Sequence, residues 1–154
     1  MTAAITKIIS GAQTGADQGG LEAALQLGIA TGGMIPKGFK TENGPMPELA
    51  DKYGLEESAS AEYPPRTRYN VVSSDATIIF GSLGERGTKL TRKMCLESKV
   101  PCLHVDSFED TDIQIAKEFL KSNKVRVLNI AGNRESKYPG LQAKVREFLV
   151  KVLS

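Results

Sequence analysis

The chain has 154 residues, of which 40% are hydrophobic and 25% charged, and its 20 basic and 18 acidic residues leave a net charge of +2. So small a charge argues against nucleic-acid binding driven by charge. Two cysteines and one histidine supply neither a disulfide framework nor a structural zinc site. No apolar run is long enough to span a membrane, and residues 1–7 contain no signal-peptide pattern. We therefore expect a cytoplasmic protein that binds neither a membrane nor nucleic acid, and we assign no residue as a metal ligand.

Short apolar segments predict five strands, and helical periodicity predicts five helices in the segments between and after them. The strands are expected over residues 5–10, 31–35, 76–80, 101–105 and 125–130, and the helices over residues 16–27, 62–73, 88–98, 113–120 and 141–152. Strands that are apolar throughout and alternate with helices predict an α/β fold whose mostly parallel sheet of about five strands is covered on both faces. One domain over residues 1–154 accounts for the whole pattern.

Residues 36–61 do not fit this alternation. They show no clear periodicity and, together with Pro64 and Pro65, contain five of the seven prolines. A connection of this length is usually a lid, a binding loop or a disordered segment. The acidic residues in and beside it are also typical of a solvated surface, so the functional and the solvated interpretation both stay open.

The glycines, 15 of the 154 residues, exceed the usual level of roughly 7%. Gly32 and Gly33 fall inside the second predicted strand, where close backbone approach is the usual reason for glycine. Seven others fall just past predicted strand ends: Gly11, Gly15, Gly38, Gly81, Gly84, Gly87 and Gly132. Ligands of open parallel sheets bind beyond the carboxyl ends of the strands, where helix N-termini present amides. The glycines therefore predict a ligand site at that edge.

The first of these loops, residues 10–17, reads Ser-Gly-Ala-Gln-Thr-Gly-Ala-Asp. Gly11 and Gly15 permit a tight turn and a close approach to a phosphate or another anion. The loop is neither a dinucleotide fingerprint nor a Walker A motif. Asp17 either binds a hydroxyl, an amine or a metal beside the anion, or complements the helix dipole. For Asp17 alone the dipole role is favoured, whereas the whole loop is interpreted as a ligand loop.

Two further loops have the same character. In residues 81–89, Gly87 and Thr88 offer amides and a hydroxyl at a helix start, while the alternative is that the glycines only accommodate a turn. In residues 129–136, Arg134 and Ser136 are candidates for contacting an anion, and Glu135 for orienting Arg134 or accepting from a heterocycle. Residues 66–70 are either a basic helix face that reaches the ligand or ordinary solvated charge.

The single histidine and the two cysteines give no sign of nucleophilic catalysis. His104 falls in the middle of a predicted strand, where a buried core position is expected. Cys95 and Cys102 fall on a predicted helix and strand, where small buried thiols are common. No Ser-His-Asp or Cys-His arrangement can be assembled from these residues.

Several motifs, taken together and in this order, resemble the putative molybdenum carrier family, a circularly permuted branch of the SLOG superfamily. They cover nearly the whole chain: residues 10–17, Gly32-Gly33 with residues 36–38, Arg66-Thr67 with Asn70, Ser74-Asp75, Gly87-Thr88 with Thr91, and residues 129–136. The chain departs from the family pattern at Ala12, where a glycine is expected, at Gln18, where an arginine is expected, and at Met34, which is often aromatic. These departures affect the shape of the first loop and not the fold.

The resemblance implies a Rossmann-like three-layer sandwich, a homo-oligomer (dimer or tetramer) and a small phosphorylated or nucleotide-like ligand. The cofactor stays unidentified, with molybdenum cofactor or molybdate as candidates. The expected ligand-binding residues are Gly11, Ala12, Gln13, Thr14, Gly15, Asp17, Lys37, Gly38, Arg66, Asn70, Gly87, Thr88, Thr91, Arg134, Glu135 and Ser136.

The wider superfamily includes cytokinin-activating phosphoribohydrolases, which carry a glutamate three residues after a Gly-Thr pair. Here Thr91 stands at that position, so the carboxylate that would stabilise an oxocarbenium ion is missing. We therefore predict a binding or carrier protein. A nucleotide N-glycosidase, with Asp17 or Glu135 as catalytic carboxylate, is the alternative, and a scaffold without a small ligand is a third.

Overall fold

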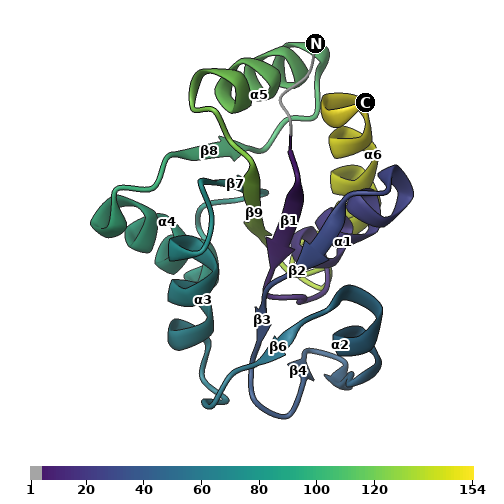
Figure 1. Ribbon diagram of the computed structural model, residues 1–154, viewed down its shortest axis with the longest axis vertical. Coiled ribbons are helices and arrows are strands. Elements are labelled where there is room, and N and C mark those ends of the chain that lie inside the picture. The colour runs from purple at the N-terminus through teal and green to yellow at the C-terminus, as the bar shows by residue number, and fades with distance from the viewer. Residues whose placement is uncertain (1–4) are drawn as a thin grey trace.

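The computed structural model describes residues 5–154 and confirms the predicted α/β Rossmann-like fold (Figure 1). Its main sheet has five strands in the order β2-β1-β9-β7-β8, and all its pairings are parallel. The strands are β1 (Lys7–Ser10), β2 (Ala30–Gly32), β7 (Ala76–Phe80), β8 (Cys102–Val105) and β9 (Val127–Gly132). The prediction that no signal peptide is present rests partly on residues 1–4, which lie outside the described residues.

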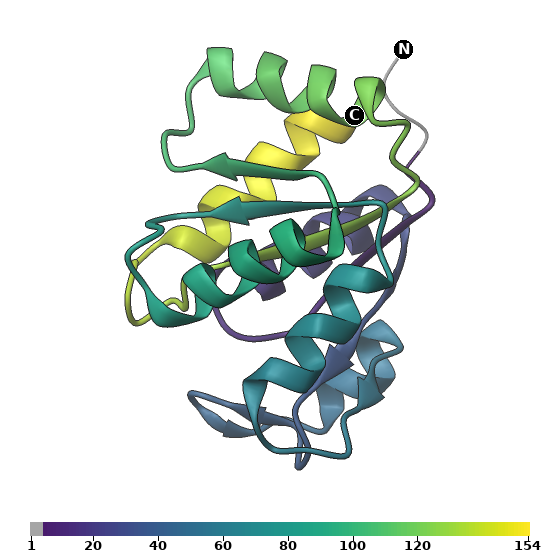
Figure 2. The same cartoon turned by 90° about the vertical axis from the view of Figure 1, so that its left-hand side faces the viewer.

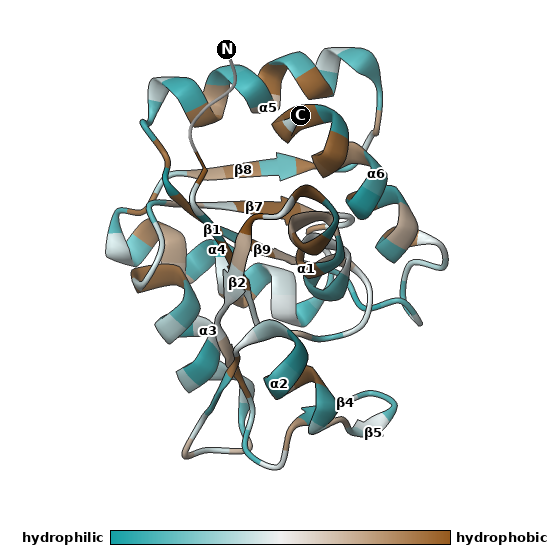
Figure 3. Ribbon diagram, turned by 45° about the vertical axis from the view of Figure 1, so that its right-hand side comes forward, coloured by the Kyte–Doolittle hydropathy of each residue, from teal (hydrophilic) through white to brown (hydrophobic). Residues whose placement is uncertain are grey.

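Helices cover both faces of the sheet, and a quarter turn shows a front group and a rear group on either side of the strands (Figure 2). The front pair is α3 (Tyr63–Val72) and α4 (Arg86–Ser98), and the rear pair is α1 (Ala16–Leu27) and α6 (Leu141–Leu153). α5 (Asp110–Ser122) packs against α6 and alternates hydrophobic with hydrophilic stretches along its length (Figure 3). Among residues 5–154, no helix is long and apolar enough to cross a membrane.

The largest apolar core lies between the sheet and α1, α5 and α6. Strand residues such as Ile78 and Leu128 are fully buried there against the helices. Phe80 stacks on Phe108 at 6.0 Å between ring centroids, and Phe148 meets both rings edge-on at 5.6 Å. Aromatic pairs in this geometry add stability beyond their buried area. This face therefore anchors the sheet.

The second predicted strand, residues 31–35, is not one strand. β2 ends at Gly32, and β3 (Met34–Ile35) pairs instead with β6 (Glu56–Glu57) in a separate small sheet. Asn70 of α3 holds the backbone of Met34, whose N–H donates to Oδ1 at 2.8 Å and whose carbonyl accepts from Nδ2 at 3.1 Å. The strand is interrupted at Gly33, between the two sheets, because Gly33 has a φ of +121° that is unfavourable for other residues. The prediction that Gly33 lies within a strand is therefore wrong.

Residues 36–61 are folded, which excludes the disordered segment that was one of the alternatives for this connection. A hairpin of β4 (Lys40–Thr41) and β5 (Gly44–Pro45) is followed by α2 (Glu48–Tyr53) and β6. Leu49 and Tyr53 pack on Ile35, Ala12 and Leu21, which form a small core of their own. Figure 1 places this segment beyond the carboxyl end of β1. The segment is therefore built onto the edge where the glycine loops predict a ligand.

His104 is exposed rather than buried, which corrects the expected core position. It lies on β8, an edge strand of the main sheet, where less of the structure covers the side chains. Its Nε2 contacts the carbonyl oxygen of Gly81. Cys95 is buried and Cys102 partly buried, both as free thiols, as expected from their positions.

Candidate functional site

The loop after β1 is shaped by contacts to its own side chains and to the loop after β9. Gly15 has a φ of +81°, and a Cβ there would contact the Asn133 carbonyl oxygen and lie 2.7 Å from the Glu135 nitrogen. Ser10 Oγ accepts from the Ala12 N–H and donates to the Asp17 carbonyl oxygen, both at 3.1 Å. The two loops therefore meet closely only because glycine stands at position 15.

The backbone amides of this loop are largely used within the fold. The Gln13 N–H donates to Asp17 Oδ2 at 3.2 Å and the Gly15 N–H to Gln142 Oε1 at 3.0 Å. The Ala16 N–H donates to the Asn133 carbonyl oxygen at 3.1 Å. Bound amides do not form an open anion cradle, so this loop serves mainly to aim its side chains.

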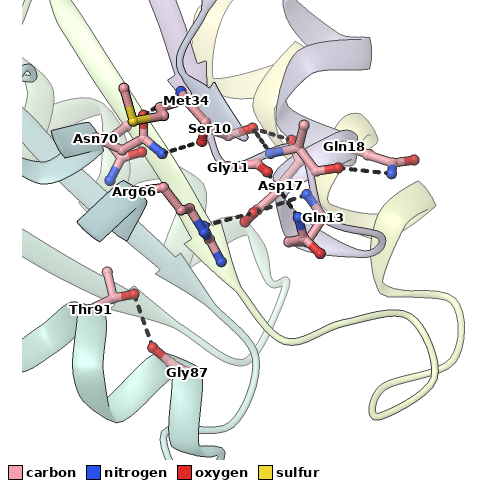
Figure 4. A network of polar contacts seen from close by, with 12 residues as sticks. Ser10, Gly11, Gln13, Asp17, Gln18, Met34, Arg66, Asn70, Gly87 and Thr91 are labelled. Carbon is pink, nitrogen blue, oxygen red and sulfur yellow. Dashed lines mark hydrogen bonds and ion pairs between the residues drawn. The ribbon is translucent and has the colours of Figure 1, made fainter. Parts of the chain in front are cut away.

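Asp17, in the first turn of α1, faces Arg66 of α3 (Figure 4). Its Oδ2 lies 3.7 Å from Arg66 Nη1, and the side chains are only 6% and 15% exposed respectively. Burial raises the pKa of Asp17 to about 6, even though the Arg66 charge and hydrogen bonds from Gln13 and Gly11 lower it. Desolvation therefore changes the pKa of Asp17 more than the ion pair with Arg66 does. Asp17 therefore complements a buried cation as well as the helix start.

The Arg66 guanidinium is held in place from two sides. Its Cζ lies 5.1 Å from the ring centroid of Tyr63, a cation–π distance. On the other side it reaches Gly11 so closely that a Cβ at that position would collide with Nη1. Burial lowers the pKa of Arg66, although the Asp17 carboxylate raises it. Arg66 Nε is buried and has no hydrogen-bond partner among residues 5–154, which leaves a donor of this cation unused.

A cleft with about 180 Å³ of empty space, part of it open to solvent, lies against Arg66. It is lined by Gly11, Arg66, Thr67, Asn70, Thr91, Asn129, Ile130 and Ala131. The lining therefore comes from the end of β1, from β9, and from α3 and α4. Of the sequence-predicted ligand residues, Gly11, Arg66, Asn70 and Thr91 meet in this cleft, and Asp17 stands beside it as the partner of Arg66.

Other predicted site residues lie elsewhere or are already bound. Thr88 is buried, and its hydroxyl donates to the carbonyl oxygens of Glu85 at 2.7 Å and Ser82 at 3.1 Å. Gly87 is exposed and its carbonyl accepts from the Thr91 hydroxyl at 3.0 Å. Lys37 and Gly38 are exposed in a turn next to β6, where the Gly38 N–H donates to Glu57.

Glu135, proposed from the sequence as a catalytic carboxylate, caps α6. Its Oε2 accepts from the Gly140 N–H at 2.7 Å and its Oε1 from the Gln142 N–H at 2.9 Å. A carboxylate at a helix N-terminus is stabilised by the free amides and the helix dipole. Both oxygens thus have partners at the start of α6.

Thr14, Arg134 and Ser136 gather around a residue that the sequence reasoning did not select. Glu42, at the tip of the β4–β5 hairpin, accepts from the Thr14 and Ser136 hydroxyls and from the Ser136 N–H at 3.3 Å. No sequence signal marks Glu42, because the partners lie 28 and 94 residues away.

Thr67 and Asn129 also line the cleft without having been assigned to it. Asn129 carried a usable signal, since it is a polar residue inside the apolar run of β9. Its Nδ2 donates to Thr77 Oγ1 at 3.1 Å, which orients the amide on the α3–α4 side of the sheet. Over residues 5–154, no group of three or more His, Cys, Asp or Glu side chains is arranged to hold a metal ion.

Comparisons with known proteins agree with this architecture. The model of the circularly permutated YpsA SLOG family matches residues 8–153. The crystal structure of a putative molybdenum carrier protein from Syntrophus aciditrophicus SB is 39% identical, with a TM-score of 0.92, and the match covers 100% of this chain and 98% of that one. A search of curated proteins found no significant match.

Proposed function

The chain belongs to the circularly permutated YpsA SLOG family, and from this premise we propose that it binds a small phosphorylated or nucleotide-like ligand in the Arg66 cleft. The observation that carries the proposal is the buried Arg66 guanidinium, whose Nε has no partner and which lines a cleft at the carboxyl ends of β1 and β9. A guanidinium in such a place favours a phosphate or another oxyanion. The position is also the one that open parallel sheets use for ligands.

The side chains at the cleft favour a ligand with two kinds of polar group. Arg66 neutralises the anionic group, and Asp17 accepts from a hydroxyl or amine next to it. The roughly 180 Å³ of empty space includes open solvent, so the cleft is an open depression that does not enclose a whole small molecule. The anionic group of the ligand therefore lies against Arg66 at the surface of the cleft, and a heterocycle attached to that group lies outside it.

The likeness to a putative molybdenum carrier protein makes molybdate or molybdenum cofactor the candidate cargo. Molybdate is a tetrahedral oxyanion, so the same cation would hold it. From the family resemblance we also propose a single domain, a cytoplasmic location and a homo-oligomer, either a dimer or a tetramer, whose mass in solution is measurable by light scattering.

Calorimetric titration with AMP, molybdate and molybdopterin tests the proposal. Wild-type protein should bind at least one of them, and Arg66→Gln should weaken that binding tenfold or more. Arg68→Gln is the matched control, because Arg68 lies two residues away on the same helix, with its side chain 56% exposed and paired with Glu97. Binding that is absent in folded wild-type protein, or lost equally in both variants, would overturn the proposal.

Hydrolysis of an N-glycosidic bond is a second candidate, favoured by the raised pKa of Asp17. A carboxyl group with a pKa of about 6 can give up or hold a proton near neutrality, as a general acid requires. Incubation with nucleoside monophosphates should then release free base, and Asp17→Asn should stop the release. Glu135→Gln should retain it, since that carboxylate caps α6. Equal turnover in wild type and Asp17→Asn would exclude this candidate.

A further inference from the structure

The β4–β5 hairpin is tied to both ligand loops through one carboxylate, that of Glu42. Oε2 accepts from the Thr14 hydroxyl of the loop after β1 and from the Ser136 N–H of the loop after β9. Oε1 accepts from the Ser136 hydroxyl. Partial burial raises the pKa of Glu42, but the hydrogen bonds from Ser136 and Thr14, together with a smaller effect of the Arg134 charge, hold it below its usual range. An ionised carboxylate is therefore stably bound between the two loops.

The donors around Glu42 are arranged as an anion site. Thr14 Oγ1 itself accepts from the Glu135 N–H at 3.2 Å, which leaves its proton directed to the carboxylate. Two hydroxyls and one backbone N–H thus converge on a single negative group, and the charge of Arg134 lies near enough to stabilise it without forming an ion pair. All four are donors or cations, and they match the oxygens of a tetrahedral oxyanion as well as those of a carboxylate.

The hairpin holds Glu42 there by contacts of its own. Thr41 Oγ1 donates to the Gly44 carbonyl oxygen at 2.7 Å and accepts from the Asn43 N–H at 3.1 Å, which fixes the tip. The Lys40 carbonyl oxygen accepts from Gln13 Nε2 at 2.9 Å. The Glu42 carboxylate is therefore presented by a formed turn, and the hairpin that carries this turn already contacts residues 10–17.

We propose that Thr14, Arg134 and Ser136 form a second anion subsite, for a phosphate group or a free tetrahedral oxyanion, and that Glu42 occupies this subsite until such a ligand displaces it. The proposal deepens the function proposed above and rests on it for the identity of the whole ligand. It adds that the subsite is separate from the Arg66 cleft and that an internal carboxylate competes for it. Removal of that competitor should raise the affinity for anions.

Titration of Glu42→Ala with inorganic phosphate, molybdate and AMP tests this subsite by calorimetry and by the NMR shift of the Ser136 amide. Glu42→Ala should bind the favoured anion about tenfold more tightly than wild type, and the Ser136 amide should shift on saturation. Glu147→Ala is the control, because Glu147 is exposed on α6 and its loss changes the net charge equally. It should differ less than twofold from wild type. Glu42→Gln, which keeps the side-chain size, serves if the alanine variant does not fold.

A second substitution assigns any gain to the subsite. Glu42→Ala combined with Ser136→Ala should lose the added affinity. The proposal is overturned if Glu42→Ala binds no more tightly than Glu147→Ala, or if the gain survives removal of Ser136. Tighter binding of AMP than of phosphate assigns the subsite to a nucleotide phosphate, and saturation by molybdate or phosphate alone assigns it to a free oxyanion. A Ser136 response that is unaffected by Arg66→Gln supports the subsite even where the cleft proposal fails.

Discussion

The two faces of the main sheet differ in what they bury. Towards α1, α5 and α6 the strands present Ile8, Ile78 and Leu128, which are fully buried in an apolar core. Towards α3 and α4 the structure buries polar side chains: Thr67, Asn70, Thr77, Thr91 and Asn129. Buried polar groups cost stability unless they are hydrogen-bonded, so their concentration on one face points to a use there. The comparison suggests that the apolar face holds the fold and the polar face recognises the ligand.

The largest expected effect on stability comes from a substitution in the apolar face. Phe148→Ala removes the ring that meets Phe80 and Phe108 edge-on at 5.6 Å. We expect the free energy of unfolding to fall by roughly 3–5 kcal/mol, because a buried aromatic side chain is lost and a cavity remains. Urea unfolding measures the loss, and Leu96→Ala, which removes a side chain that is 70% exposed, should change it by less than about 0.5 kcal/mol.

Ligand affinity sharpens this first prediction. Where Phe148→Ala is still folded, it should bind the ligand as tightly as wild type, since α6 contributes nothing to the Arg66 cleft. A loss of unfolding free energy below about 1 kcal/mol would mean that the aromatic cluster repacks, and that this face is less critical than its burial indicates.

The same contrast explains what the sequence predicted and what it did not. The stripe of Leu141, Val145 and Phe148 predicted the buried face of α6, because helical periodicity encodes burial directly. The glycine loops predicted the edge that carries the cleft. The break of the second strand at Gly33 was missed, because a strand pattern does not reveal that Asn70 captures the Met34 backbone. Glu42 was missed because only the folded hairpin brings it to Thr14 and Ser136.

The second prediction probes the charge buried beside the polar face. The pKa of Asp17 in the folded state, about 6, exceeds the ordinary value of 3.8, so between these values the folded protein holds a proton that the unfolded chain has lost. This contribution to stability is fully present below pH 3.8 and is lost as the pH rises through about 6. The free energy of unfolding of Asp17→Asn, relative to wild type, should therefore rise by roughly 3 kcal/mol between these limits.

Denaturant titrations across this range, on both proteins, isolate Asp17 because all other groups titrate in both. Asp75→Asn is a control of opposite sign. Hydrogen bonds from the Val127 and Arg126 N–H groups hold the pKa of Asp75 below its usual value. Its stabilising contribution is lost as the pH falls, so Asp75→Asn should lose stability relative to wild type as the pH rises. A flat difference for Asp17→Asn would show that Arg66 fully compensates the burial of its partner.

The smallest effect is expected from Asn70, where the polar face meets the small sheet of β3 and β6. Asn70→Ala leaves both the Met34 N–H and its carbonyl without their side-chain partner, at a cost of roughly 1–3 kcal/mol. Because Asn70 also lines the cleft, ligand affinity should fall with it, unlike in Phe148→Ala. Faster hydrogen exchange of the Met34 amide would locate the change. Val72→Ala, on the same helix but 55% exposed, should alter neither stability nor exchange. If Asn70→Ala weakened stability and left ligand affinity intact, the polar face would be structural at this position and recognition would rest on Arg66 and Asp17.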